Sequence, residues 1–464
     1  MIVATWNKHH LRVLIMLAAE LVAGLHHAGA EPAAGGGFAK PAPSFQRVVI
    51  DSRNESQSHK PKLLDRFSKD GGNDIGSMDR DGFKLYCYAE QWKAHVIFPV
   101  GDPGGFEDGV TADINGDGGQ DIVLGGWGHR TIWAENPAGH GQSPYLTQWK
   151  VHVVDAGRFS HEVCAADMNH DGKCDVVTTA GIFFQGATAD DWHFVDIGKG
   201  GQGTAVGNVL GNGDGFNDVI SVYQRNGANQ IAWFENPGHT GGDPVRGHWV
   251  VHIVDGNPGG ASANRDMDEL AIAFGDLNHD GRPDIIVASM GEGPDPANDP
   301  RQLGDGLVWY QGPSNPRTDR WTRHVIDATA GWVHASSIEL ADFNGDGHLD
   351  VCYAEQDQSG PTPSAASGGG RKDGVHSPRL VICYNVRGDG LLWQPSVLSQ
   401  YPEPGAGGFN SKVGIIGHDA LPSIVTSLHG CWSSANPILL WRNQGLQSRG
   451  SASAAGKQPS ELGR

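Results

Sequence analysis

The chain has 464 residues, with 34 Lys and Arg against 53 Asp and Glu, for a formal net charge of -19. Nucleic acids and anionic membrane surfaces need clustered basic side chains, so this balance excludes both as expected partners. Glycine is abundant at 68 residues and helical periodicity is scarce, so the sequence predicts strands joined by many turns.

The N-terminal segment has the pattern of an export signal. A basic and His-containing start at 8–12 precedes a short apolar run at 13–25 and small residues at 28–30 that fit a cleavage site. Spanning a bilayer takes about 20 apolar residues, so this run is too short for a transmembrane helix. We therefore expect a protein secreted to the periplasm or the extracellular space, with a signal peptide at 1–30, a flexible linker at 31–44 and no membrane span.

A nine-residue pattern, D-x-N-x-D-G-x-x-D, recurs along the rest of the chain. Four complete copies lie at 113–121, 167–175, 276–284 and 342–350, and three weaker copies lie at 66–74, 210–218 and 415–423. Two other patterns keep step with it: an aromatic strand ending in Asn-Pro or Gly-Pro, such as TIWAENP at 131–137, and a Trp-x-x-His strand, such as WKVHVVD at 149–155. Seven units of four antiparallel strands predict an all-β fold, a seven-bladed β-propeller over 45–445.

The last of these units lacks a recognisable fourth strand. The strand FQRVVID at 45–51 stands alone near the N-terminus and has the sequence of such a strand. We expect it to complete the last blade and close the ring, because closure removes the open sheet edges that invite aggregation. Residues 446–464 are expected to form a disordered polar tail.

Six cysteines are few for a chain of this length. Cys352 and Cys383 fall in adjacent predicted strands, and Cys164 and Cys174 flank one loop. Each pair either forms a disulfide in an oxidising compartment or remains as two buried thiols.

The repeated nonapeptide has the oxygen-rich spacing of a calcium loop. Side chains at positions 1, 3, 5 and 9 can direct oxygens at one centre, and Gly at position 6 permits the sharp turn. The alternative is a turn held by Asx hydrogen bonds without a metal. We expect Ca2+ at the four complete loops, with the ligands Asp113, Asn115, Asp117, Asp121, Asp167, Asn169, Asp171, Asp175, Asp276, Asn278, Asp280, Asp284, Asp342, Asn344, Asp346 and Asp350.

These loops resemble those of the FG-GAP/VCBS repeat family of β-propellers over 45–445. The resemblance implies a seven-bladed wheel with structural calcium on one rim. It implies no single activity, because the architecture carries adhesion modules, lectin-like binders, and lyases or dehydratases. The Trp-x-x-His strands, the Asn-Pro strands and the loops together also resemble the propeller part of aldos-2-ulose dehydratase-type proteins, which act on keto-sugars and carry cupin domains after the propeller.

The segments just before the first strand and just after the second strand of each unit should meet opposite the calcium loops, at the mouth of the central channel. Candidate acid–base and anion-binding residues there are His161, His334, Tyr223 and Arg225. Candidate ligand-binding residues are Glu107, Asp108, Glu162, Asp268, Glu269, Trp127 and Arg130, with Gln185, Gln202 and Lys412 in the same set.

This mixture of aromatic, acidic and basic side chains favours a carbohydrate or another polar ligand. One alternative is a sugar lyase or dehydratase acting by β-elimination, with His161, His334 and Tyr223 as base and acid. Another is a structural adhesion or protein-interaction module. The histidines of the Trp-x-x-His strands share one strand position, which predicts a structural role against neighbouring blades for His95, His152, His252 and His324.

Overall fold

The computed structural model describes most of the chain between residues 42 and 446. The described ranges are 42–52, 62–68, 72–79, 81–99, 106–126, 130–225, 228–256, 270–289, 306–330, 333–355, 379–400, 409–427 and 437–446. The signal peptide, most of the linker and nearly all of the tail lie outside them, so those assignments stay predictions. No helix in the described part of the chain is long and apolar enough to cross a membrane.

Seven antiparallel sheets of four strands each make up the described residues. Blades 1 and 2 are β2 (Lys62–Asp65), β3 (Asp74–Asp79), β4 (Gly82–Cys87) and β5 (Lys93–Phe98), then β6 (Asp108–Ala112), β7 (Asp121–Gly125), β8 (Thr131–Glu135) and β9 (Lys150–Asp155). Blades 3 and 4 are β10 (Val163–Ala166), β11 (Asp175–Thr178), β12 (Gly181–Gln185) and β13 (Trp192–Val195), then β14 (Thr204–Gly207), β15 (Asp218–Arg225), β16 (Ala228–Glu235) and β17 (Val250–Asp255).

The remaining three blades follow the same order. Blades 5 and 6 are β18 (Leu270–Gly275), β19 (Asp284–Ser289), β20 (Leu307–Gln311) and β21 (Thr322–Asp327), then β22 (Val333–Ala341), β23 (Asp350–Glu355), β24 (Arg379–Asn385) and β25 (Trp393–Gln400). Blade 7 is β26 (Phe409–Gly414), β27 (Ser423–Ser427), β28 (Ile438–Asn443) and β1 (Phe45–Asp51). The one helical element of the described ranges is the short 3-10 helix η2 (Pro237–Thr240). The predicted all-β, seven-bladed propeller is confirmed.

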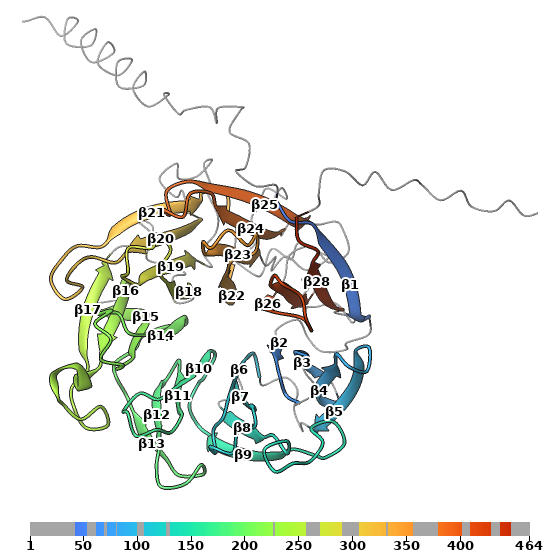
Figure 1. Ribbon diagram of the computed structural model, residues 1–464. Helices are drawn as coiled ribbons and strands as arrows, with labels where there is room; N and C mark the ends of the chain where they lie inside the picture. The colour runs from blue at the N-terminus through green and yellow to red at the C-terminus, as the bar shows by residue number, and fades with distance from the viewer. Residues whose placement is uncertain are drawn as a thin grey trace, which may run out of the picture. The chain divides into compact units, whose positions relative to one another are not determined.

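The first strand of every blade lies at the centre of the ring (Figure 1). Each of β2, β6, β10, β14, β18, β22 and β26 contacts the first strands of both neighbouring blades. Side chains on these seven strands therefore surround one central axis. The loops that follow them emerge together at one end of that axis, and the segments that precede them emerge at the other.

The N-terminal strand closes the ring as the sequence predicted. β1 pairs antiparallel with β28, from Phe45 opposite Asn443 to Val49 opposite Leu439, and a bulge follows. Val48 and Ile50 pack into the apolar cluster between blades 7 and 1. The hydroxyl of Tyr86 in blade 1 also donates to Asp51, at 2.8 Å. The last blade is thus completed by the start of the propeller chain.

The histidines of the Trp-x-x-His strands are packed on aromatic rings. His152, His252 and His324 stack on Trp133, Trp233 and Trp309 in the third strand of their own blade, at ring distances of 3.9, 4.3 and 4.6 Å. These stacks lie within one blade, because register places each Trp directly opposite its His. His152 also contacts Asp190 of the neighbouring blade 3, as expected. His95 has Leu85 opposite and lies instead against Tyr145 of blade 2, at 5.3 Å.

The five described cysteines are free thiols. Cys352 lies opposite Ile382, and Cys383 lies opposite Val351. Because side chains alternate between the two faces of a sheet, this one-residue offset directs the two sulfurs to opposite faces. Of the two alternatives, the structure selects unbridged cysteines.

Candidate functional site

The loops between the first and second strands form one rim of the propeller, called here the loop rim. In blade 2, the Asp113 carboxylate accepts hydrogen bonds from the N–H groups of Gly116 and Gly118, at 2.8 and 2.9 Å, and folds the loop back on itself. Gly118 at position 6 has a φ of 84°, as the turn argument predicted. The backbone at position 4 is also in the left-handed region, with φ of 75° at Gly116 and 60° at His170. The sequence pattern did not predict this requirement.

Position 9 of each complete loop is a fully buried aspartate. The two oxygens of Asp121 accept from the N–H groups of Ile114 and Asn136, at 2.9 and 2.7 Å. Burial, and then the carboxylates at positions 5 and 1, raise the pKa of this residue to about 7 in all four loops, at Asp121, Asp175, Asp284 and Asp350. Three carboxyl groups thus lie in each loop, and a divalent cation that prefers oxygen would relieve the repulsion that opposes their ionisation.

In five blades, an amide side chain at the end of the third strand joins the blade to the one before it. Asn136 Nδ2 donates to the carbonyl of Phe67, at position 2 of the loop in blade 1. The same bond recurs from Gln185 to Ile114, Asn236 to Met168, Asn385 to Leu277 and Asn443 to Phe343. The expected place of Gln185 at the channel mouth is therefore wrong, because this residue ends β12 on the loop rim.

Two of the incomplete loops carry a protein cation among their acidic residues. In blade 4, His239 lies between Asp214 and Asp218, with contacts of 2.6 and 2.9 Å. Burial lowers the pKa of His239, but its hydrogen bonds to the two aspartates outweigh this and raise it to about 9. In blade 7, the Arg442 guanidinium binds both oxygens of Asp419, at 2.7 and 2.8 Å. Each of these loops is neutralised from within the chain.

A buried histidine between two glutamates lies at the opposite end of the axis. His161 Nδ1 is 2.6 Å from Glu162, and its Nε2 contacts Glu107. All three residues are at least nine-tenths buried. Burial lowers the pKa of His161, but the two carboxylates raise it well above its usual value, so the ring is an imidazolium at neutral pH. This group, with Asp108 and Gln202, is called here the axial mouth.

Two buried acceptors of the axial mouth lack a donor. Asp108 Oδ2 accepts from the N–H of Val163 at 3.1 Å, whereas its Oδ1 has no hydrogen-bond partner among the described residues. The same holds for Oε1 of Gln202. These two residues are only 6% and 7% exposed. Buried acceptors of this kind are suited to a ligand that carries hydroxyl or amino donors.

Further charged side chains lie on and beside the innermost strands. Lys412 on β26 lies 3.5 Å from Glu339 on β22, and these side chains are 26% and 23% exposed, so solvent reaches the axis. Lys199 donates to the carbonyl of Thr178 and to Thr204 Oγ1, at 2.8 and 2.6 Å, and burial lowers its pKa to about 8. Sequence reasoning missed Glu339 and Lys199. A charged residue within an innermost strand was the available signal for Glu339.

The structure describes the side chains of two other predicted mouth residues, Tyr223 and Arg130. Tyr223 on β15 packs edge-on against Phe234, at 6.1 Å, in the apolar cluster of blades 3 and 4. Arg130 is exposed just before β8. His334 and Arg225 lie on β22 and β15, with side chains outside the description, and Trp127, Asp268 and Glu269 lie outside the described ranges. A joint acid–base role for His161, His334 and Tyr223 stays a prediction.

These features define a class: a seven-bladed β-propeller with acidic loops on one rim and a buried polar group at the other end of its axis. The FG-GAP-like repeat model matches residues 113–178 and 212–287, and the FG-GAP repeat model matches 270–309. The protein is therefore a β-propeller that carries FG-GAP-like repeats within 113–309, as its loops predicted. No curated protein sequence matches the chain.

Several solved structures are similar to the chain at low identity. A lectin from Agrocybe aegerita, described as recognising non-reducing terminal N-acetylglucosamine, is 15% identical with a TM-score of 0.46, over 79% of this chain and 82% of the lectin. BBS1N, in complex with ARL6DN, is 10% identical with a TM-score of 0.48, over 88% and 100%. YCF48 from Cyanidioschyzon merolae is 13% identical with a TM-score of 0.44, over 85% and 98%. These similarities carry no information about the ligand of this chain.

Proposed function

We propose that this protein is an exported, calcium-stabilised β-propeller that binds a carbohydrate, or another ligand rich in hydroxyl groups, at the axial mouth. The observation that carries the proposal is the pair of buried acceptors without donors, Asp108 Oδ1 and Gln202 Oε1. A buried acceptor without a partner costs about 1–3 kcal/mol, and sugar hydroxyl groups supply the donors it lacks. Export is inferred from the signal pattern at 1–30.

The contacts of His161 with Glu107 and Glu162, called here the clamp, support the same role. They hold the axial mouth in one arrangement. Glu162 uses one oxygen for His161 and the other for the Thr179 hydroxyl, at 2.7 Å. Glu107 comes from blade 2, whereas His161 and Glu162 come from blade 3, so the clamp also joins two blades. A preorganised site loses less conformational entropy when a ligand binds.

Calcium would act at the other end of the axis, away from this ligand. The four complete loops lie in blades 2, 3, 5 and 6 and hold three converging carboxylates each. In two of the three incomplete loops, those of blades 4 and 7, His239 and Arg442 supply a positive charge instead. We infer that the ion stiffens the loop rim and takes no part in binding the ligand.

Elimination from a sugar ranks second to binding. A general base needs a free lone pair near the proton that it removes. Both nitrogens of His161 already contact carboxylates, and its raised pKa keeps it protonated. We expect no new ultraviolet absorbance when the protein is mixed with uronic-acid polysaccharides or keto-sugars. An unsaturated product that disappears with His161→Ala would reverse this ranking.

The proposal is tested by a glycan array followed by calorimetric titration of the glycans that bind. Asp108→Asn and Gln202→Ala should each weaken binding by about 10-fold or more, the loss expected for one hydrogen bond to a charged or buried group. Asp243→Asn is the matched control, because this half-exposed aspartate follows the third strand of blade 4, on the loop-rim side. Failure of the wild-type protein to bind any glycan, or equal affinity in all variants, would reject the proposal.

A further inference from the structure

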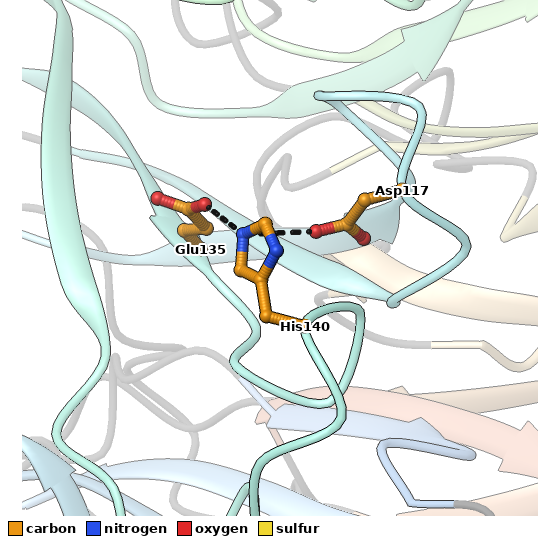
Figure 2. Close-up of side chains that lie close together, drawn as sticks. All are labelled: Asp117, Glu135 and His140. Carbon is orange, nitrogen blue, oxygen red and sulfur yellow. Dashed lines mark hydrogen bonds and ion pairs between the residues drawn. The ribbon is translucent and has the colours of Figure 1, made fainter.

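A second group of polar side chains lies on the loop rim of blade 2 (Figure 2). His140 Nε2 is 2.8 Å from Glu135 Oε1 and 3.4 Å from Asp117 Oδ2. One ligand atom from each of the three residues lies within 4.8 Å of the other two. Glu135 ends β8, His140 follows in the next loop, and Asp117 is position 5 of the acidic loop, so three separate segments meet here.

We propose that Asp117, Glu135 and His140 bind a divalent transition metal ion, Zn2+ before others. One imidazole nitrogen and two carboxylate oxygens are donors that Zn2+ accepts in sites that keep a fourth position open. Ligand atoms of tetrahedral zinc lie roughly 3.4 Å apart, close to the separations found here. The side chain of His140 is 54% exposed, which leaves a fourth position for water or a molecule from solution.

Gly139 provides the space that brings Asp117 into this group. A Cβ at residue 139 would lie 1.9 Å from Oδ1 and 2.2 Å from Oδ2 of Asp117. The backbone of Gly139 is not in the left-handed region, so glycine is needed here for space and not for conformation. Any larger residue would push the Asp117 carboxylate out of its present position beside His140.

Hydrogen bonds from outside the group orient its carboxylates. Glu135 Oε2 contacts His152 Nε2 at 3.1 Å, and the other nitrogen of His152 contacts Asp190. Asn115 Nδ2 donates to Asp117 Oδ2 and to Glu135 Oε1, at 3.0 and 3.3 Å. Supporting bonds of this kind fix the direction of metal ligands and tune their affinity. They leave Glu135 Oε1 on the side of His140.

Blade 4 carries the same residue types without the same arrangement. His239 turns toward Asp214 and Asp218, and Glu235 binds Arg317, at 2.5 Å. The carboxylates of blade 4 are therefore already neutralised by a histidine and an arginine. We expect zinc at blade 2 and none at blade 4.

The test is a calorimetric titration of the full chain with ZnCl2, run first without calcium and then with it because Asp117 is also an expected calcium ligand. The visible absorbance of bound Co2+ gives a second reading. The wild-type protein should show one site that binds zinc more tightly than the isolated histidines on its surface do. His140→Ala and Gly139→Ala should each weaken that site by about 10-fold or more. His248→Ala, which removes an exposed histidine of blade 4, should leave it unchanged.

Two results would overturn the assignment: no such site in the wild-type protein, or equally tight zinc binding in His140→Ala. His140 is exposed, so its removal should leave the thermal unfolding midpoint unchanged and the comparison interpretable. The outcome is independent of the glycan test, because that test probes the axial mouth at the other end of the axis.

Discussion

The inter-blade hydrogen bond of Asn236 is the sharpest test of how the ring is held together. Asn236 is fully buried, and its Nδ2 donates to the carbonyls of Met168 and Asn217, at 2.8 and 2.9 Å. Its Oδ1 accepts from the N–H of Gly238 at 2.9 Å. Replacing Asn236 by alanine removes all three bonds and leaves two carbonyls and one N–H without these partners.

The size of the effect follows from these three groups. A buried polar group that loses its partner costs about 1–3 kcal/mol, so Asn236→Ala should destabilise the protein by about 3 kcal/mol or more. Asn236→Asp keeps the side-chain size but replaces the donor by an oxygen that faces two carbonyls, so its loss should be at least as large. Differential scanning calorimetry in calcium should show both midpoints lowered by several degrees, because the transition temperature falls with lost stability.

Gln142→Ala is the control for this experiment, because Gln142 is exposed in the same rim region of blade 2. Its free energy of unfolding should stay within about 0.5 kcal/mol of the wild-type value, as for most surface substitutions. If both Asn236 variants also stayed within that limit, the inter-blade bond would not be a stabilising element. Blade 5 has Gly312 at the position that Asn236 occupies in blade 4. A Cβ there would lie 2.2 Å from the Pro283 carbonyl oxygen, so a larger residue would not fit without a shift.

Three further predictions concern closure, calcium and protonation. Deleting residues 31–51 removes β1 and exposes the edge of β28, so we expect a lower melting temperature and self-association by light scattering; melting like the full chain would contradict ring closure. Chelation of calcium should also lower the melting temperature, because an ion at 100 times its Kd adds about 2.7 kcal/mol per loop; an unchanged curve would argue against calcium. His161 has a raised pKa in the folded state, so its contribution to stability is complete below the unfolded pKa and is lost as pH rises through the folded one. Its ring signals in NMR should therefore not titrate between about pH 6 and about pH 8, and a midpoint within that interval would show that the clamp is not as described.

Features that depend on short stretches of chain were predictable. Gly at position 6 and the Asp residues at positions 1 and 9 define a turn through contacts within nine residues, so the loops could be found without the fold. The apolar residue at position 2 also repeats, from Phe67 to Ile416, and is buried in six blades; blade 4 has the exposed Gly211 there and buries Val209 instead. The role of the Asn in the Asn-Pro pattern was missed, because its partner carbonyl lies 69 positions away for Asn136 and 68 for Asn236.

The sequence by itself determined the number of blades, the loops and the closing strand. Each follows from local periodicity and from the need to pair every strand edge. Only the tertiary structure decided which polar residues meet, as Asp108 and Val163 do across 55 positions. Cys352 and Cys383 are a second example. The sequence predicted that they lie on adjacent strands, but it did not predict the register that directs their sulfurs to opposite faces. The physical reason is that register and blade packing position side chains through many weak contacts between distant segments, and no short stretch of sequence contains them.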